Sequence, residues 1–212
     1  YKVSPVGHYC NRLYHTMENA IPYHTSSPTM VVLTPGVHNS AYFEHSFLAQ
    51  QMGIALVEGK DLYVENDKVY MKTISGGLRV DCIYRRLNDT YLDPKSFFKG
   101  SLIGVPGLFK AYRKGNVGII NAPGTGVADD KVIYSYVPEM IKYYLGEDPK
   151  IEQVETFRCF DDKHRDHVLK NINKMVVKPA DGSGGNGIMI GPKSKISERE
   201  EFQKKIMKDP RN

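Results

Sequence analysis

The sequence predicts an α/β protein in which a doubly wound, largely parallel layer is followed by a smaller α+β region. Two observations lead to this expectation. Short apolar runs alternate with helical patterns over residues 30–121, and a glycine-rich turn lies between two apolar strands near residue 182. Alternating strands and helices are typical of a parallel sheet covered by helices. The 212 residues, 41% of them hydrophobic, suffice for one sizeable core or two modest ones.

The first 29 residues form a helix and a connector in this prediction. Apolar side chains recur at helical spacing over residues 6–20, and a polar stretch with two prolines follows at 22–28. Residues 1–29 are therefore expected to precede the sheet.

A strand–helix–strand unit comes next. Residues 30–34 read as a buried strand, Ser40 as the cap of a helix that Gly53 ends, and residues 54–57 as a second strand. A crossover of this length predicts parallel, neighbouring strands. A hairpin over residues 62–72, buried strands at 80–84 and 117–120, and a short helix at 108–113 complete the layer.

The pattern changes near residues 121–128, where we place a domain boundary. Asp129 or Asp130 begins a helix that Pro138 interrupts, and another helix covers residues 162–171. Residues 174–180 and 188–190 are predicted strands on either side of the glycine-rich turn. Ser197 and Glu200 have the spacing of a capping box before a last helix.

Charge, cysteine content and apolar run lengths narrow the class of protein. The net charge of +5 is spread along the chain without a basic block, so nucleic-acid binding is not indicated. Three distant cysteines favour free thiols in a reducing compartment. No apolar run has the length of a membrane span and no signal-peptide pattern opens the chain, so we expect a cytoplasmic protein. The abrupt ends, Tyr1 and Asn212, suggest a segment of a longer protein.

The glycine-rich turn is the most informative stretch. Gly182, Gly184 and Gly187 satisfy the pattern GxGxxG, but a strand pattern follows them where a dinucleotide site needs a helix, and Ile188 stands where a Walker A loop needs lysine. A hairpin laid over phosphates fits better, because bare backbone N–H groups can approach anionic oxygens closely. The turn residues concerned are Gly182, Ser183, Gly184, Gly185, Asn186 and Gly187.

Two lysines accompany the turn. Lys178 lies on the predicted leading strand, where burial among apolar neighbours would be costly without an anionic partner. The alternative is a lysine that merely reaches solvent. Lys131 opens a helix after an asparagine-led glycine loop, which is favourable geometry for an anion, although most lysines in a first helical turn are surface charges.

Together these residues resemble the ATP-grasp superfamily, and more closely the circularly permuted ATP-grasp proteins often named glutathionylspermidine synthase-like. The resemblance covers about residues 4–212 and is carried by the segments 33–36, 39–45, 81–86, 124–131 and 178–185. It implies a Rossmann-like pre-ATP-grasp domain over residues 30–124. Part of an ATP-grasp domain, an α+β lid with a glycine-rich β-hairpin, would follow over residues 125–212.

The resemblance also implies a chemistry. Lys131 and Lys178 would contact ATP phosphates, and the turn at 182–187 would cover them. A substrate carboxylate would attack the γ-phosphoryl group, and an amine would capture the acyl phosphate. The Mg²⁺ ligands of the family come after the lid, so we expect them outside this chain, which alone would bind ATP weakly and not turn over.

Arg85 and Arg86 end a predicted strand at the ligand edge of the sheet, and one of them is a candidate to hold a substrate carboxylate. A surface ion pair is the alternative. The histidines show no metal-ligand spacing, and no metal site is predicted. Two other functions stay open: a nicotinamide-dependent oxidoreductase that uses the GxGxxG pattern at Gly182, and a non-catalytic scaffold. The acid and amine substrates and the oligomeric state are not indicated.

Overall fold

A computed structural model describes residues 5–182 and 185–211 of the chain. It divides into two compact units, residues 1–125 and residues 126–212. Each unit has its own hydrophobic core and is described by itself.

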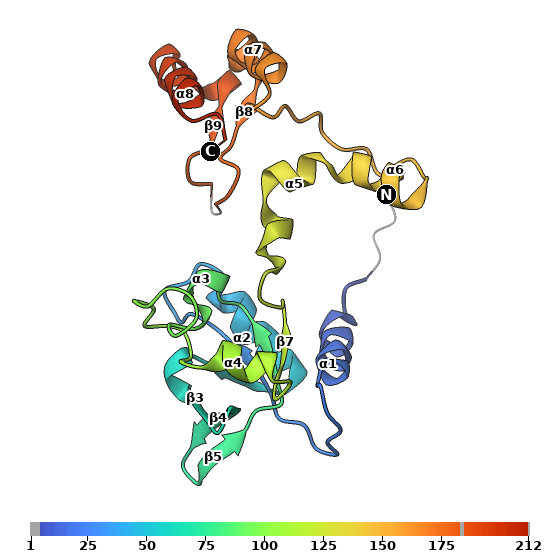
Figure 1. Cartoon of the computed structure of the whole chain (residues 1–212), viewed down its shortest axis with the longest axis vertical. Helices are drawn as coiled ribbons and strands as arrows, with labels where there is room; N and C mark the ends of the chain where they lie inside the picture. The colour runs from blue at the N-terminus through green and yellow to red at the C-terminus, as the bar shows by residue number, and fades with distance from the viewer. Residues whose placement is uncertain (1–4, 183–184, 212) are drawn as a thin grey trace. The chain divides into compact units, whose positions relative to one another are not determined.

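A four-stranded parallel sheet organises the first unit (Figure 1). The strand order is β2-β1-β6-β7, and each neighbouring pair is parallel. The strands are β1 (Met30–Leu33), β2 (Ala55–Val57), β6 (Cys82–Arg85) and β7 (Gly118–Ile120). Every residue of β1 and β6 is buried, as expected for the central strands of a sheet covered on both faces. The predicted α/β class with a parallel sheet is confirmed.

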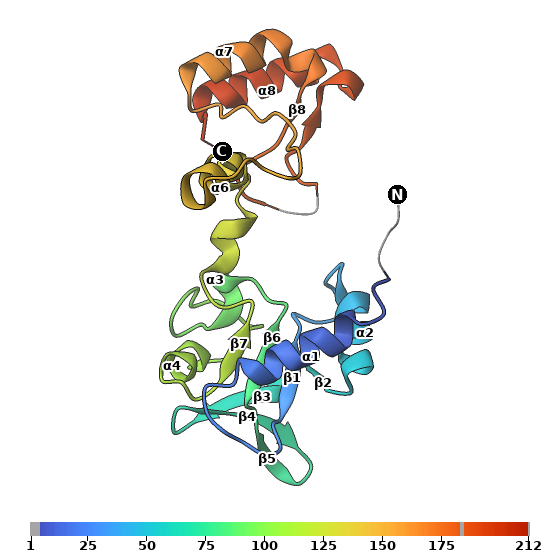
Figure 2. The same cartoon turned by 90° about the vertical axis from the view of Figure 1, so that its right-hand side faces the viewer.

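Helices cover one face of this sheet, and a helix with a small second sheet covers the other. The helices α1 (Tyr9–Asn19) and α2 (Tyr42–Met52) lie on one side of the strands (Figure 2). Their side chains Met17, Leu48 and Met52 are buried in a cluster with side chains of the central strands. On the opposite face, α4 (Leu108–Arg113) shares a core with an antiparallel sheet. That sheet consists of β3 (Leu62–Glu65), β4 (Lys68–Thr73) and β5 (Gly76–Arg79), and the shorter helices are η1 (Gly59–Asp61) and α3 (Asp89–Leu92).

Two local predictions for the first unit need correction. Ser40 does not cap α2: the helix starts after Ala41 without a side-chain cap, and Asn39 instead accepts a hydrogen bond from the Ala41 N–H at 2.9 Å. The predicted hairpin is extended by β5, which the glycine-rich sequence 76–79 did not suggest. The C-terminal glycine of α2 behaves as predicted, since Gly53 has φ 66°.

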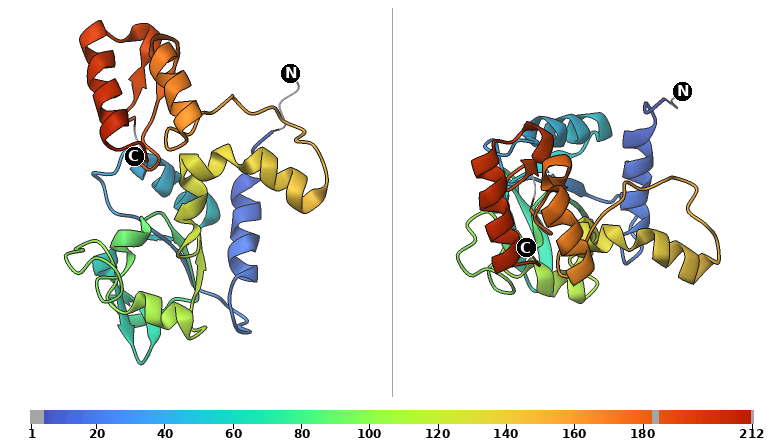
Figure 3. Two further views of the ribbon diagram at one scale, coloured as in Figure 1. Left: turned by 45° about the horizontal axis from the view of Figure 1, so that its top comes forward. Right: turned by 90° about the horizontal axis from the view of Figure 1, so that it is seen from above.

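In the second unit, two helices pack on a two-stranded antiparallel sheet. The strands β8 (Val176–Val177) and β9 (Met189–Ile190) pair directly, and α7 (Asp162–Asn171) lies beside α8 (Ile196–Lys208) (Figure 3). Val168, Ile172, Met189 and Ile206 form the buried core. The remaining elements are η2 (Thr125–Asp129), which crosses the division between the units, α5 (Lys131–Ser135), α6 (Val137–Leu145), η3 (Ile172–Lys174) and η4 (Gly191–Lys193).

The structure corrects two predictions here as well. The strand predicted over residues 174–180 is only two residues long, because η3 occupies its start and Pro179 its end. The predicted capping box at Ser197 is absent, since α8 already begins at Ile196 after Lys195, with no side-chain cap.

Candidate functional site

The glycine-rich turn joins β8 to β9 and is built from backbone that side chains disfavour. Gly182, Gly185 and Gly187 have φ values of 102°, 80° and 71°, in the left-handed region that glycine adopts at little cost. These three glycines and Asn186 are exposed. Ser183 and Gly184, also predicted to belong to the site, lie outside the described residues. The turn therefore presents accessible backbone, as a phosphate-covering hairpin requires.

Lys131 contacts this turn twice. Its backbone N–H donates to the carbonyl oxygen of Ala180 at 2.9 Å, and its ammonium donates to the carbonyl oxygen of Gly182 at 3.0 Å. The preceding residue, Asp130, caps α5 by accepting from the N–H of Val132 at 2.7 Å. The cap fixes the start of α5 and with it the position of Lys131. The predicted lysine and the predicted turn are therefore in contact although about 50 positions separate them in the sequence. Nothing in the spacing had indicated the contact with Ala180.

Lys178 lies directly after β8 and is exposed. The expectation that it is buried in an apolar strand is therefore wrong. Within residues 5–182 and 185–211, its ammonium has no hydrogen bond or ion pair. Lys178 lies between β8 and the carbonyl groups of Ala180 and Gly182 that Lys131 contacts.

Arg85 is buried, with only 6% of its surface exposed, and its guanidinium contacts several protein acceptors. It donates to the carbonyl oxygens of Asn121 at 2.6 Å and Leu87 at 2.7 Å, and it forms an ion pair with Asp89 at 2.7 Å. The amide of Asn121, whose φ is 58°, returns a hydrogen bond to the Arg85 carbonyl at 3.1 Å. These contacts join the end of β6 to the segment that follows β7.

Arg86 is more accessible. Its side chain is 24% exposed and forms an ion pair with Glu44 at 2.7 Å, at the carboxyl edge of the parallel sheet. The strand order changes direction between β1 and β6, which is where open α/β sheets bind ligands. The sequence alternatives for Arg86, a surface ion pair and a carboxylate-binding residue, are thus both compatible with its position.

A buried polar pair underlies the same edge. The Nδ1 of His45 lies 2.8 Å from the hydroxyl oxygen of Thr34, and His45 is only 1% exposed. Burial, followed by the positive charge of Arg86, lowers the pKa of His45 below its usual value. A neutral imidazole therefore holds Thr34, whose hydroxyl also accepts from the Gly36 N–H at 3.2 Å. No spacing in the sequence had pointed to this pair.

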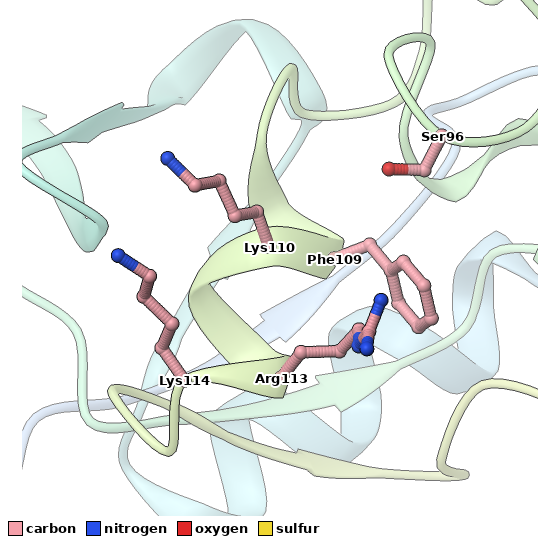
Figure 4. Close-up of a pocket in the computed structure, with 5 residues that line it drawn as sticks. All are labelled: Ser96, Phe109, Lys110, Arg113 and Lys114. Atoms are coloured by element: carbon pink, nitrogen blue, oxygen red, sulfur yellow. The ribbon is translucent and has the colours of Figure 1, made fainter.

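A basic pocket of about 310 Å³ lies elsewhere on the first unit, around α4. Figure 4 shows Lys110 and Lys114 directed to one side, with Arg113 close to the ring of Phe109. Asp67 accepts ion pairs from Lys110 at 2.8 Å and from Lys114 at 2.5 Å, and these two contacts lower the pKa of its carboxyl. None of the predicted site residues lines this pocket.

In residues 5–182 and 185–211, no three His, Cys, Asp or Glu side chains gather as a group able to hold a metal ion. Over the same ranges, no helix has both the length and the apolar character that crossing a bilayer requires.

The chain thus has a parallel α/β sheet and, later in the sequence, a glycine-rich turn that Lys131 contacts, the features on which the resemblance to ATP-grasp proteins was based. Comparison with known families agrees: residues 1–212 match the family described as circularly permuted ATP-grasp type 2, and the chain belongs to that family.

Similar proteins are longer than this chain. It is 52% identical over 210 residues to an uncharacterized protein of Synechocystis, which covers 99% of this chain and 44% of that protein. It is 49% identical over 212 residues to an uncharacterized protein of Mycobacterium tuberculosis, covering 100% and 38%. A Frankia casuarinae protein named "Putative glutamate--cysteine ligase 2-2" is 47% identical over 188 residues, covering 88% and 22%. The chain thus spans less than half the length of these curated relatives.

Proposed function

We propose that this chain supplies the ATP-binding elements of an ATP-dependent carboxylate–amine ligase. The observation that carries the proposal is the hydrogen bond from Lys131 to the Gly182 carbonyl beside an exposed glycine turn, with the exposed Lys178 directly after the strand that leads into the turn. In this proposal, residues 30–124 are a Rossmann-like pre-ATP-grasp domain and residues 125–212 carry the lid. The whole chain is one part of a longer, cytoplasmic enzyme.

The residues of the second unit fit the triphosphate of ATP. Lys131 and Lys178 bring two cations, and the backbone around Gly185 is open, since a Cβ placed there would meet no atom within 4 Å. Bound ATP supplies the phosphoryl group that activates a carboxylate as an acyl phosphate, which an amine then captures. The lysines neutralise charge on the phosphates, and the turn excludes water from them.

The described residues do not fit Mg²⁺, since they lack an acidic cluster. The family resemblance assigns the Mg²⁺ ligands to polypeptide outside this chain, and in this proposal the chain alone binds ATP without turnover.

The substrates proposed are a small carboxylic acid and an amine. The name of the Frankia protein refers to a ligase that joins two amino acids, which is a reaction of this class. Arg86 is the better placed of the two arginines to contact a carboxylate, because Arg85 uses its guanidinium on Asn121, Leu87 and Asp89. Exchange of the Glu44 carboxylate for a substrate carboxylate would cost little at a partly exposed site.

The oxidoreductase alternative has less support. In a dinucleotide fold the third glycine opens a helix whose N-terminus meets the pyrophosphate. Here Gly187 leads into β9, which pairs with β8. A non-catalytic scaffold with the same fold remains a competitor that only binding can decide.

Equilibrium binding of ATP, with and without Mg²⁺, tests the proposal against both alternatives. We expect ATP to bind, Lys178→Ala to weaken it about tenfold, and Lys174→Ala, which changes another exposed lysine of the second unit, to leave it unchanged. NADH should not compete. Absence of ATP binding would favour the scaffold, and preferential binding of NADH would favour the oxidoreductase.

A further inference from the structure

The helix α6 has an apolar face that the described residues of the second unit leave partly or largely exposed. Five apolar side chains recur at positions i, i+3, i+4, i+7 and i+8, which places them along one side of the helix. We call this set the α6 face: Val137, Met140, Ile141, Tyr144 and Leu145. None of its residues is buried, and Met140, Tyr144 and Leu145 are 37%, 77% and 66% exposed. A helix with this pattern normally buries such a face.

The core of the second unit does not use the α6 face. That core is formed by side chains of α7, α8, η3 and β9, together with partly buried neighbours that include Phe157 and Phe202. On the polar side of α6, Glu139 forms an ion pair with Arg158 at 3.6 Å. Ile151 and Val154, on the connection that follows, are also exposed. Apolar surface therefore continues from α6 into this connection without a partner among residues 126–182 and 185–211.

The size of the α6 face bears on what covers it. Nine residues at 1.5 Å each make a helix roughly 14 Å long. Its face is too small to provide the ~800 Å² per partner of a standard interface between free proteins. A partner attached to the same polypeptide needs less area, because tethering raises its effective concentration to about the millimolar range. A second copy of this chain is therefore the less suitable occupant.

The relatives carry further polypeptide to which such a partner could belong. The alignments, 52% and 49% identical overall, include α6 but cover only 44% of the Synechocystis protein and 38% of the Mycobacterium tuberculosis protein. We propose that the α6 face is an internal docking surface for the polypeptide that these relatives carry outside the matched segment. This inference rests on the proposal that the chain is part of a longer protein, and it is independent of ATP binding.

Amide hydrogen exchange without nucleotide tests the proposal. A hybrid protein would carry this chain in place of the matched segment of the Synechocystis relative. Exchange over residues 137–145 should be at least tenfold slower in the hybrid than in this chain alone. The same comparison between the native Synechocystis protein and its matched segment gives a readout that does not depend on folding of the hybrid.

Substitutions locate the surface. The double variant Tyr144→Ser with Leu145→Ser should return exchange over residues 137–145 in the hybrid to the fast rate of the isolated chain. The control, Ile74→Ser with Leu78→Ser, removes two other exposed apolar groups, which belong to the first unit, and should leave that rate slow.

Three results would overturn the proposal. One is equal exchange of α6 in the long and short proteins. Another is a dimer of the isolated chain that the Tyr144 and Leu145 substitutions dissociate, since a second copy would then be the occupant. The third is binding of the isolated chain to phospholipid vesicles through the same two residues. Loss of ATP binding with slow α6 exchange retained would count against the proposed function alone.

Discussion

The ammonium of Lys131 lies 3.0 Å from the carbonyl oxygen of Gly182, so the first residue of α5 is tied to the first glycine of the turn. A lysine ammonium has three donors, and this contact uses one of them. In the proposed function, the remaining donors and the positive charge would bind a phosphate beside the turn, while the contact with Gly182 positions the turn.

Lys131→Met should weaken ATP binding about tenfold, because it removes a cation and releases the turn at Gly182. Equilibrium binding measures the change. Lys142→Met is the matched control, since it alters an exposed lysine on α6 without a contact to the turn. Equal affinity of the Lys131 variant and the wild type would mean that Lys131 only supports the fold.

Substitution of Arg85 and of Arg86, at the end of β6, should lower the free energy of unfolding by different amounts. Arg85→Ala leaves Asp89 and three carbonyl oxygens without a buried donor, so we expect a loss of about 3–5 kcal/mol from the first unit. Arg86→Ala breaks a partly exposed ion pair and should cost about 1 kcal/mol or less. Urea unfolding, with hydrogen exchange of β6 and β7 amides, measures both.

A large effect of Arg86→Ala on stability would contradict this assignment. An unchanged stability of Arg85→Ala would show that water or other side chains replace the lost donor. Either result would reverse the ranking of the two arginines as ligand-binding candidates.

The elements that the sequence predicted well have strong local signals. The bounds of α4 and α7 agree with the prediction, as does the end of α2 at Gly53, because caps and apolar spacing act within a few residues. The short β8 and the missing capping box at Ser197 differ from the prediction because neighbouring elements determined them. The helices η3 and η4 occupy the backbone around the β8–β9 pair, and α8 starts two residues earlier than the box required.

The site was predictable only in part for the same reason. The glycines and lysines were visible as residue types at suggestive positions. The hydrogen bonds that join Lys131 to Ala180 and Gly182, or Arg85 to Asn121, connect residues 36 to 51 positions apart. One sequence carries no periodic signal for such contacts.

Tyr23 should ionise only at very high pH. Burial first, and then the hydrogen bond to Asp81 at 2.5 Å, raise the pKa of Tyr23 to about 12. Since the folded-state pKa exceeds the ordinary value near 10, the contribution of Tyr23 to stability is complete below pH 10. It is then lost as the pH rises through about 12. The ultraviolet difference spectrum between wild type and Tyr23→Phe isolates this one titration.

Tyr23→Phe also removes a hydrogen-bond donor from the buried Asp81. The carboxylate would still accept a hydrogen bond from the Thr29 N–H, at 2.8 Å in the structure. The expected cost is about 1–3 kcal/mol at neutral pH. In urea unfolding, the free energy of unfolding of the wild type should fall between about pH 10 and 12. The part of this decrease that Tyr23 causes should be absent from the variant. A Tyr23 that titrates near pH 10 would rule out the described hydrogen bond in solution.

Gly191 is where the second unit should tolerate a methyl group least. A Cβ at this position would lie 2.0 Å from the Ile172 carbonyl oxygen and 2.7 Å from that of Met175. Both obstacles are backbone, so relief requires η3 to move away from η4, which also breaks the hydrogen bond from the Gly191 N–H to Met175 at 2.8 Å. We therefore expect Gly191→Ala to cost about 3 kcal/mol or more, by overpacking and loss of this bond.

The consequence for function follows from the position of η3 and η4 beside β8 and β9. If the two short helices separate, the strand pair that holds the glycine-rich turn loses its support, and ATP binding should fall together with protection of α7 and α8 amides from hydrogen exchange. Gly7→Ala is the control, because a Cβ there meets no atom within 4 Å. If the Gly191→Ala protein lost protection of α7 and α8 and still bound ATP with unchanged affinity, the turn would bind nucleotide without the support of β8 and β9. In that case the hairpin contacted by Lys131 would not explain the site.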